Sequence, residues 1–205
     1  MIDPANITNY NLSTKELEET ILWWILAAGK NGVTAARCLE SLLSSWTIGS
    51  PFETIIYINL KTDLGLEMKK HGIGCYNNKA KSFLDLIKKN LDLKKCSLEE
   101  LESVVGIGCK TARCYLLHSR PNQRYAGLDT HCLAYLKDLG VKVPKSTPTG
   151  KKYKELENTF LKLVSVSKKS SADLDLLIWK VYSGKDKTSE SKKFLLSLKE
   201  RLEFW

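Results

Sequence analysis

Two residues in this chain combine a reactive side chain with a sequence context that favours catalysis. Lys110 follows a run that contains two glycines, and Asp129 stands in the sequence Leu-Asp-Thr-His. A neutral lysine amine is a nucleophile, and an ionised carboxylate can stabilise the cationic sugar of a breaking glycosidic bond. Together with the turn described next, the pair indicates an enzyme that acts on DNA.

A tight turn between two helices precedes the lysine. Apolar residues recur at helical spacing from Leu98 to Val104, Gly106 and Gly108 interrupt the pattern, and it resumes at Thr111. Glycines let the backbone approach a ligand closely, and the N–H groups that open the second helix favour an anion. We therefore expect this turn to bind a DNA phosphate through Gly106, Gly108, Lys110 and Thr111. A pair of glycines alone more often ends a helix, so the interpretation depends on Lys110 and Asp129.

The surroundings of both residues are consistent with these roles. The helix dipole disfavours a charge on Lys110, and Arg113 one turn later adds repulsion, although DNA phosphates act in the opposite direction. Asp129 precedes an apolar helical segment and is suited to be its N-cap. Capping and catalysis are compatible, because a carboxylate at a helix N-terminus stays ionised.

Three segments, in this order, resemble motifs of the helix-hairpin-helix DNA glycosylases, which include endonuclease III and the 8-oxoguanine DNA glycosylases. Residues 71–80 read His-Gly-Ile-Gly-Cys-Tyr-Asn-Asn-Lys-Ala and resemble the family's Gly-x-Tyr-x-x-Lys-Ala. Residues 104–112 resemble the hairpin Leu-Pro-Gly-Val-Gly-x-Lys-Thr-Ala, and 128–131 resemble Val-Asp-Thr-His. The resemblance spans roughly residues 21–185 and implies that Lys110 and Asp129 are the catalytic lysine and aspartate.

Because it has this lysine, the chain resembles the family's bifunctional members, which remove a base and also cut the strand. The implied mechanism is attack of Lys110 on C1′ of a flipped nucleotide, loss of the damaged base, a Schiff base, and β-elimination 3′ to the lesion. Asp129 would assist base loss and help to activate the amine. A non-catalytic DNA-binding module with the same hairpin is an alternative, but the presence of both residues argues against it.

The cysteines bear on the choice of branch. The six stand at positions 38, 75, 96, 109, 114 and 132 without a Cys-x-x-Cys pair, so we interpret them as ordinary thiols. Endonuclease III carries an iron-sulfur cluster after a helix similar to 174–185, and no cysteine follows Cys132 here. We therefore expect no cluster and no required cofactor, and favour an 8-oxoguanine glycosylase. An endonuclease-III-like enzyme for oxidised pyrimidines that lacks the cluster is the alternative.

The resemblance suggests further site residues. Asn31 is the candidate wedge that fills the gap left by the flipped nucleotide, or it is only a turn residue in Asn-Gly. Cys109 is a candidate neighbour of the lesion, and Trp205 a candidate to stack on it. In the family a sodium or potassium ion binds hairpin carbonyls, which here are those of Glu102, Val104 and Ile107. His131 is expected to orient the turn after the aspartate.

Helical patterns dominate, and we predict an all-α fold of two helical lobes with a DNA-binding cleft between them. The resemblance assigns 21–134, with the hairpin at about 98–118, to a central lobe, and 1–20 plus 135–205 to a second lobe. Capping boxes are expected at Ser13-Thr-Lys-Glu16 and Ser97-Leu-Glu-Glu100, and Trp23 and Trp24 are expected in the core. The predicted helices span residues 14–29, 33–45, 52–71, 78–90, 98–105, 109–118, 130–139, 153–165, 172–183 and 189–202.

Composition is consistent with a nucleic-acid partner. The chain has 205 residues, a formal net charge of +9 and a sequence pI near 9.2, which favour a polyanion. It shows neither an apolar leader nor a run of about eighteen apolar residues. We therefore expect an intracellular protein of the cytoplasm or nucleoid of a prokaryote, monomeric, without membrane contact, that binds double-stranded DNA with a damaged base.

Overall fold

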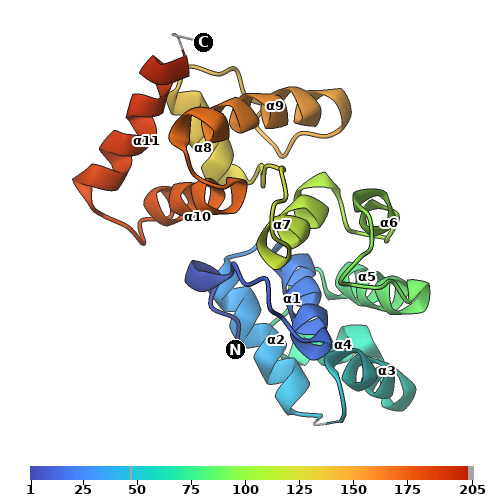
Figure 1. Cartoon of the computed structure of the whole chain (residues 1–205). Coiled ribbons are helices and arrows are strands. Elements are labelled where there is room, and N and C mark those ends of the chain that lie inside the picture. Colours follow the sequence, from blue (N-terminus) through green and yellow to red (C-terminus); the bar gives the residue numbers. More distant parts are fainter. Residues whose placement is uncertain (47, 203–205) are drawn as a thin grey trace. The chain divides into compact units, whose positions relative to one another are not determined.

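The computed structural model describes residues 1–46 and 48–202, and all regular structure in these ranges is helical, as the sequence predicts. The chain divides into two compact units, Met1–Tyr115 and Leu116–Trp205, which run from blue to green and from yellow-green to red in Figure 1. The lobe assignment drawn from the sequence groups the helices differently and stays a prediction.

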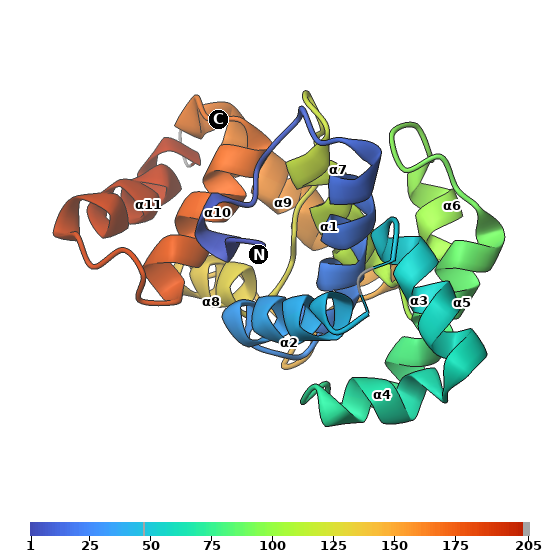
Figure 2. The same ribbon diagram turned by 90° about the horizontal axis from the view of Figure 1, so that it is seen from below.

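The first unit is organised around α1 (Thr14–Ala27), which contacts α2, α3 and α5 (Figures 1 and 2). Every residue from Ile21 to Leu26 is buried, because a helix that is apolar on all sides has to lie inside a core. The burial of Trp23 and Trp24 is thereby confirmed. The other helices are η1 (Pro4–Asn6, a 3-10 turn), α2 (Gly32–Ser44), α3 (Pro51–Lys61), α4 (Leu64–Lys70), α5 (Tyr76–Lys89), α6 (Leu98–Glu102) and the start of α7 (Cys109–Ser119).

Capping boxes begin three helices of this unit. Those at Ser13 and Ser97 are confirmed, since each serine side chain accepts from the N3 amide while the N3 glutamate accepts from the serine amide. A third box, at Ser50 with Glu53, begins α3 with Pro51 in its first turn. These local pairs satisfy amides that a helix leaves without intrahelical partners.

The predicted single helix over 52–71 is wrong. The structure contains two helices there, because Thr62 is extended (φ −153°, ψ 178°) and ends α3. Asp63 then caps α4 by accepting a hydrogen bond from the Leu66 amide at 2.7 Å. A Thr-Asp pair inside an apolar helical pattern is a start signal, and here it outweighs the periodicity on either side.

The second unit contains the end of α7 followed by α8 (Thr130–Asp138), α9 (Gly150–Ser167), α10 (Ser171–Tyr182) and α11 (Ser189–Leu202). Helix α10 contacts α8, α9 and α11, and α11 also contacts α9. The core consists of apolar residues from each helix, such as Leu136, Phe160, Ile178 and Leu195. The unit therefore has an interior of its own against which the segment before Asp129 packs.

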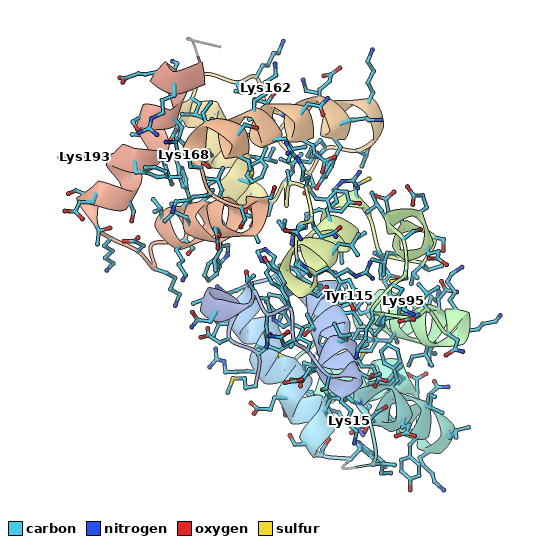
Figure 3. All side chains as sticks on the ribbon, in the orientation of Figure 1. Lys15, Lys95, Tyr115, Lys162, Lys168 and Lys193 are labelled. Atoms are coloured by element: carbon cyan, nitrogen blue, oxygen red, sulfur yellow. The ribbon has the colours of Figure 1, made fainter. Side chains whose placement is uncertain are left out.

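Many lysine side chains lie on the outside of both units. Lys15 and Lys95 in the first unit, and Lys162, Lys168 and Lys193 in the second, are exposed, whereas Tyr115 is fully buried (Figure 3). No helix within 1–46 and 48–202 is long and apolar enough to span a bilayer.

Candidate active site

The hairpin between α6 and α7 is anchored by buried apolar side chains and exposed at its tip. Val104 and Ile107 are buried, whereas Val105, Gly106 and Gly108 are exposed. Gly106 has φ +81°, a left-handed conformation that favours glycine, and a Cβ there would collide with Ser82 Oγ on α5. The requirement for glycine at this position is therefore both conformational and steric.

Helix α5 supports the hairpin. The Val105 amide donates to Asp85 Oδ2 at 2.8 Å, and Ser82 lies directly under Gly106. Helix α5 begins in the motif 71–80. Two of the segments that resemble glycosylase motifs are therefore in contact, because α5 packs against the hairpin. Sequence alone indicated their order in the chain and not this contact.

The expected phosphate site gathers on this one turn. Gly106 and Gly108 are exposed beside the first turn of α7, where amides lack intrahelical partners. Thr111 is 4 % exposed, so its side chain is turned into the protein and a phosphate contact would use its amide. Phosphate binding by these residues stays a prediction.

The carbonyls expected to bind a monovalent cation follow the C-terminal end of α6. Val104 O accepts a hydrogen bond from the Ile107 amide at 3.0 Å, and a carbonyl oxygen keeps a second lone pair. The negative end of the helix dipole also favours a cation at this turn. Binding of a sodium or potassium ion by the carbonyls of Glu102, Val104 and Ile107 stays a prediction.

Lys110 is half-buried in the first turn of α7, and its amine lies over the ring of Trp24 on α1. The distance from Nζ to the ring centroid is 4.9 Å, and Trp24 is 7 % exposed. A cation over an indole face is stabilised, and the contact limits the rotamers of a flexible lysine stem. The sequence predicted that Trp24 is a core residue, but the apolar pattern of α1 did not indicate that its ring faces the amine of Lys110.

The charge of Arg113 is compensated within the hairpin. Its Nη1 forms an ion pair with Glu102 Oε1 and also donates to Cys109 O at 3.3 Å. The repulsion between Arg113 and Lys110 that we expected from the sequence is accordingly reduced by a carboxylate from α6. The pair also joins the two hairpin helices, and Cys109 is half-buried beside Lys110.

Asp129 caps α8, as predicted. Its Oδ1 accepts the amides of His131 at 2.9 Å and Cys132 at 2.8 Å, and its own backbone is extended (φ −84°, ψ −177°). His131 contacts the aspartate through its backbone amide, as other residues at this position could, and its orienting role stays a prediction. Lys110 belongs to the first unit and Asp129 to the second.

The segment before Asp129 is buried without regular secondary structure and is held by side chains of α9. Tyr153 Oη donates to Ala126 O at 2.6 Å and accepts the Leu128 amide at 3.3 Å. Glu157 Oε1 accepts the Ala126 amide at 3.1 Å. Ala126 and Leu128 are 0 % exposed, so these bonds satisfy backbone groups that water cannot reach. Sequence missed both residues, which lie in an amphipathic helix that was interpreted only as scaffold.

Asn31 is the N-cap of α2. Its Oδ1 accepts the amides of Val33 at 3.0 Å and Thr34 at 3.2 Å, and the residue is exposed. Asn31 is therefore a helix cap and not a turn residue in Asn-Gly, since Gly32 is already the first residue of α2. The wedge role stays a prediction. Trp205, the predicted lesion-stacking residue, lies outside the described residues.

Lys79, from the motif 71–80, is buried beneath the turn that ends α1. It is 8 % exposed, its Nζ donates to Leu26 O at 2.8 Å, and it borders a cavity of about 40 Å³ together with Lys30 and Cys38. Burial lowers the pKa of Lys79, and the nearby Lys30 lowers it further, against opposing effects of Cys75 and Cys38.

This lowered pKa predicts a pH-dependent stability. Between the folded pKa of Lys79 and its ordinary value of 10.5, the unfolded chain binds more protons, so stability rises with pH. We expect the free energy of unfolding of the wild type, relative to that of Lys79→Met, to increase as the pH rises toward 10. Urea unfolding at several pH values measures this, and Lys81→Met, an exposed neighbour, is the control. Parallel curves for wild type and Lys79→Met would contradict the prediction.

The described residues contain no cluster of metal-ligating side chains. No group of three or more His, Cys, Asp or Glu side chains within them is arranged to hold an ion. Cys96, Cys114 and Cys132 are buried, which agrees with their interpretation as core thiols.

Comparison with known proteins identifies the fold. No family model matches the chain. Among solved structures, it is similar to the 8-oxoguanine glycosylase/lyase of Methanocaldococcus jannaschii, whose crystal structure is a complex with a 15mer DNA containing 8-oxoguanine. The identity is 22 %, the TM-score 0.65, and the match covers 85 % of this chain and 84 % of that chain. The chain thus has the helical fold of that DNA glycosylase/lyase.

Proposed function

We propose that this protein is a bifunctional DNA glycosylase and AP lyase that excises an oxidised base, 8-oxoguanine in first place, from duplex DNA. The observation that carries the proposal is the position of Lys110, an amine in the first turn of α7 after an exposed glycine hairpin. Asp129 supports it, because this residue caps α8 within the segment that resembles Val-Asp-Thr-His. The fold similarity to an 8-oxoguanine glycosylase/lyase supports the substrate class.

In the proposed reaction the neutral amine of Lys110 attacks C1′ of the flipped nucleotide. The C1′–N bond breaks, and the departing base receives a proton. Asp129 stabilises the positive charge that develops on the sugar and assists deprotonation of the amine. Opening of the sugar ring yields a Schiff base between Nζ and C1′. Loss of a proton from C2′ then expels the 3′ phosphate, and water later hydrolyses the imine to release the enzyme.

Other residues have supporting roles in this proposal. Gly106, Gly108 and Thr111 join Lys110 in holding a phosphate of the damaged strand, and Asn31 enters the space that the flipped nucleotide leaves. Cys109 and Trp205 border the extruded base. The protein acts as a monomer inside the cell, where its DNA substrate is found. It needs no cofactor beyond a structural monovalent cation at the hairpin.

Borohydride trapping tests the proposal directly. We expect a covalent adduct of the wild-type protein with labelled duplexes that contain 8-oxoguanine or an abasic site, because borohydride reduces a Schiff base to a stable amine. Duplexes with thymine glycol, with uracil and with no lesion are the comparison set. An adduct with thymine glycol and not 8-oxoguanine would move the enzyme to the pyrimidine branch. No adduct even with the abasic duplex would overturn the proposal in favour of a DNA-binding module.

A further inference from the structure

A buried histidine pairs with a partly buried aspartate in the second unit, and neither takes part in the chemistry proposed above. His118 is 1 % exposed at the end of α7, and its Nε2 lies 3.1 Å from Asp175 Oδ2 on α10. The second carboxylate oxygen of Asp175 accepts the amide of Gly127 at 3.2 Å. Since a carboxylate only accepts, the imidazole donates through Nε2.

The cost of burying His118 beside a partly buried carboxylate argues for a role beyond stability. Well-packed apolar residues often replace a buried pair of this kind without loss of stability, because desolvation offsets the attraction between the partners. An apolar pair, however, cannot form hydrogen bonds that fix the orientation of two segments. Each oxygen of Asp175 is directed at a different segment, one at the end of α7 and one at the segment that leads into Asp129.

Both segments matter for the proposed function. Helix α7 begins at Cys109 and carries Lys110 in its first turn, so His118 is at the other end of the lysine-bearing helix. Gly127 is two residues before Asp129, and its carbonyl accepts the Asp129 amide at 2.6 Å. A single carboxylate therefore joins the last turn of α7 to the residues that fix the backbone of Asp129.

We propose that His118 and Asp175 are positioning residues for Asp129, which hold the 126–128 segment against the end of the lysine-bearing helix. The inference rests on the proposed function for its kinetic consequence. Tyr153 and Glu157 hold the same segment from α9, whereas Asp175 shares its carboxylate with α7. Misplacement of a catalytic group by about 1 Å reduces rates by as much as about 100-fold, so the expected effect is large enough to measure.

The test uses His118→Leu, which removes the donor that orients the Asp175 carboxylate and thereby weakens its bond to the Gly127 amide, and His118→Gln, which restores an N–H donor. Single-turnover excision should fall about 10- to 100-fold in His118→Leu and recover most of that loss in His118→Gln. Affinity for a duplex with a tetrahydrofuran abasic analogue should change less than about twofold. The matched control is Tyr135→Phe, which loses a buried hydrogen bond from Tyr135 Oη to Leu195 O in the same unit. Its rate should equal that of the wild type.

A double-mutant cycle separates positioning from general damage. In an Asp129→Asn background, His118→Leu should lower the residual rate less than about twofold, because it acts through the carboxylate that is already absent. An equal loss in both backgrounds, or an unchanged rate in the single variant, would overturn the inference.

Amide hydrogen exchange gives a readout independent of activity. Protection of the Gly127 and Leu128 amides should drop at least about tenfold in His118→Leu relative to Tyr135→Phe. If exchange changes as expected while the wild type excises no base, the proposed function fails and the structural part of the inference stands. Unchanged protection would overturn the inference whatever the activity, and Asp175→Asn repeats the measurement if His118→Leu does not fold.

Discussion

Replacing Lys110 by glutamine should abolish borohydride trapping and strand scission on an abasic duplex. Glutamine keeps a polar side chain, one atom shorter than lysine and without the charge that lies over the Trp24 ring. Its amide nitrogen is no nucleophile, so no Schiff base can form. Base excision should fall by at least about 1,000-fold, since attack and charge stabilisation act as one unit. Gel assays of adduct and cleaved strand measure both losses.

The control for this experiment is a lysine with the same charge and no proposed role. Lys95→Gln, at an exposed position, removes one positive charge and should keep full activity (Figure 3). Both variants should still bind the duplex with an abasic analogue, and Lys110→Gln should lose more affinity than Lys95→Gln because Lys110 also contacts a phosphate in the proposal. Adduct formation that survives in Lys110→Gln would assign the nucleophile to another amine.

Local signals explain why much of the fold was predictable from the sequence. A helix start depends on a few neighbouring residues, and the boxes at Ser13 and Ser97 and the cap at Asp129 all form as their spacing indicates. The error at Thr62 has the same origin. A local cap competes there with a longer apolar period, and periodicity alone does not decide which one prevails.

The site was predictable where it is local and not where it depends on contacts distant in sequence. The hairpin glycines and Lys110 occupy alternate positions from 106 to 110, so spacing was enough to bring them together. Three contacts join different elements: the ring of Trp24 over the amine, the pairing of Arg113 with Glu102, and the support of Val105 in the hairpin by Asp85 on α5. Burial and charge indicate that such partners are needed, but the packing of the unit decides which residues they are.

Substituting asparagine for Asp129 should separate its two roles. Asparagine caps a helix about as well as aspartate, so α8 and the free energy of unfolding should change little, by less than about 1 kcal/mol. The carboxylate charge is lost, however, and stabilisation of a cationic sugar is an electrostatic effect in a site of low dielectric. Base excision should therefore fall about 100- to 10,000-fold, which single-turnover kinetics on the 8-oxoguanine duplex measures.

Asp129→Ala and Asp129→Ser complete the argument because they vary the cap independently of the charge. Alanine removes both acceptor and charge and should cost about 1 kcal/mol of stability, whereas serine keeps the cap. All three variants should be similarly slow if charge is what matters, although their unfolding midpoints differ. Activity that follows stability across the series, with asparagine and serine close to the wild type, would mean that Asp129 is only a helix cap and that the proposed mechanism lacks its carboxylate.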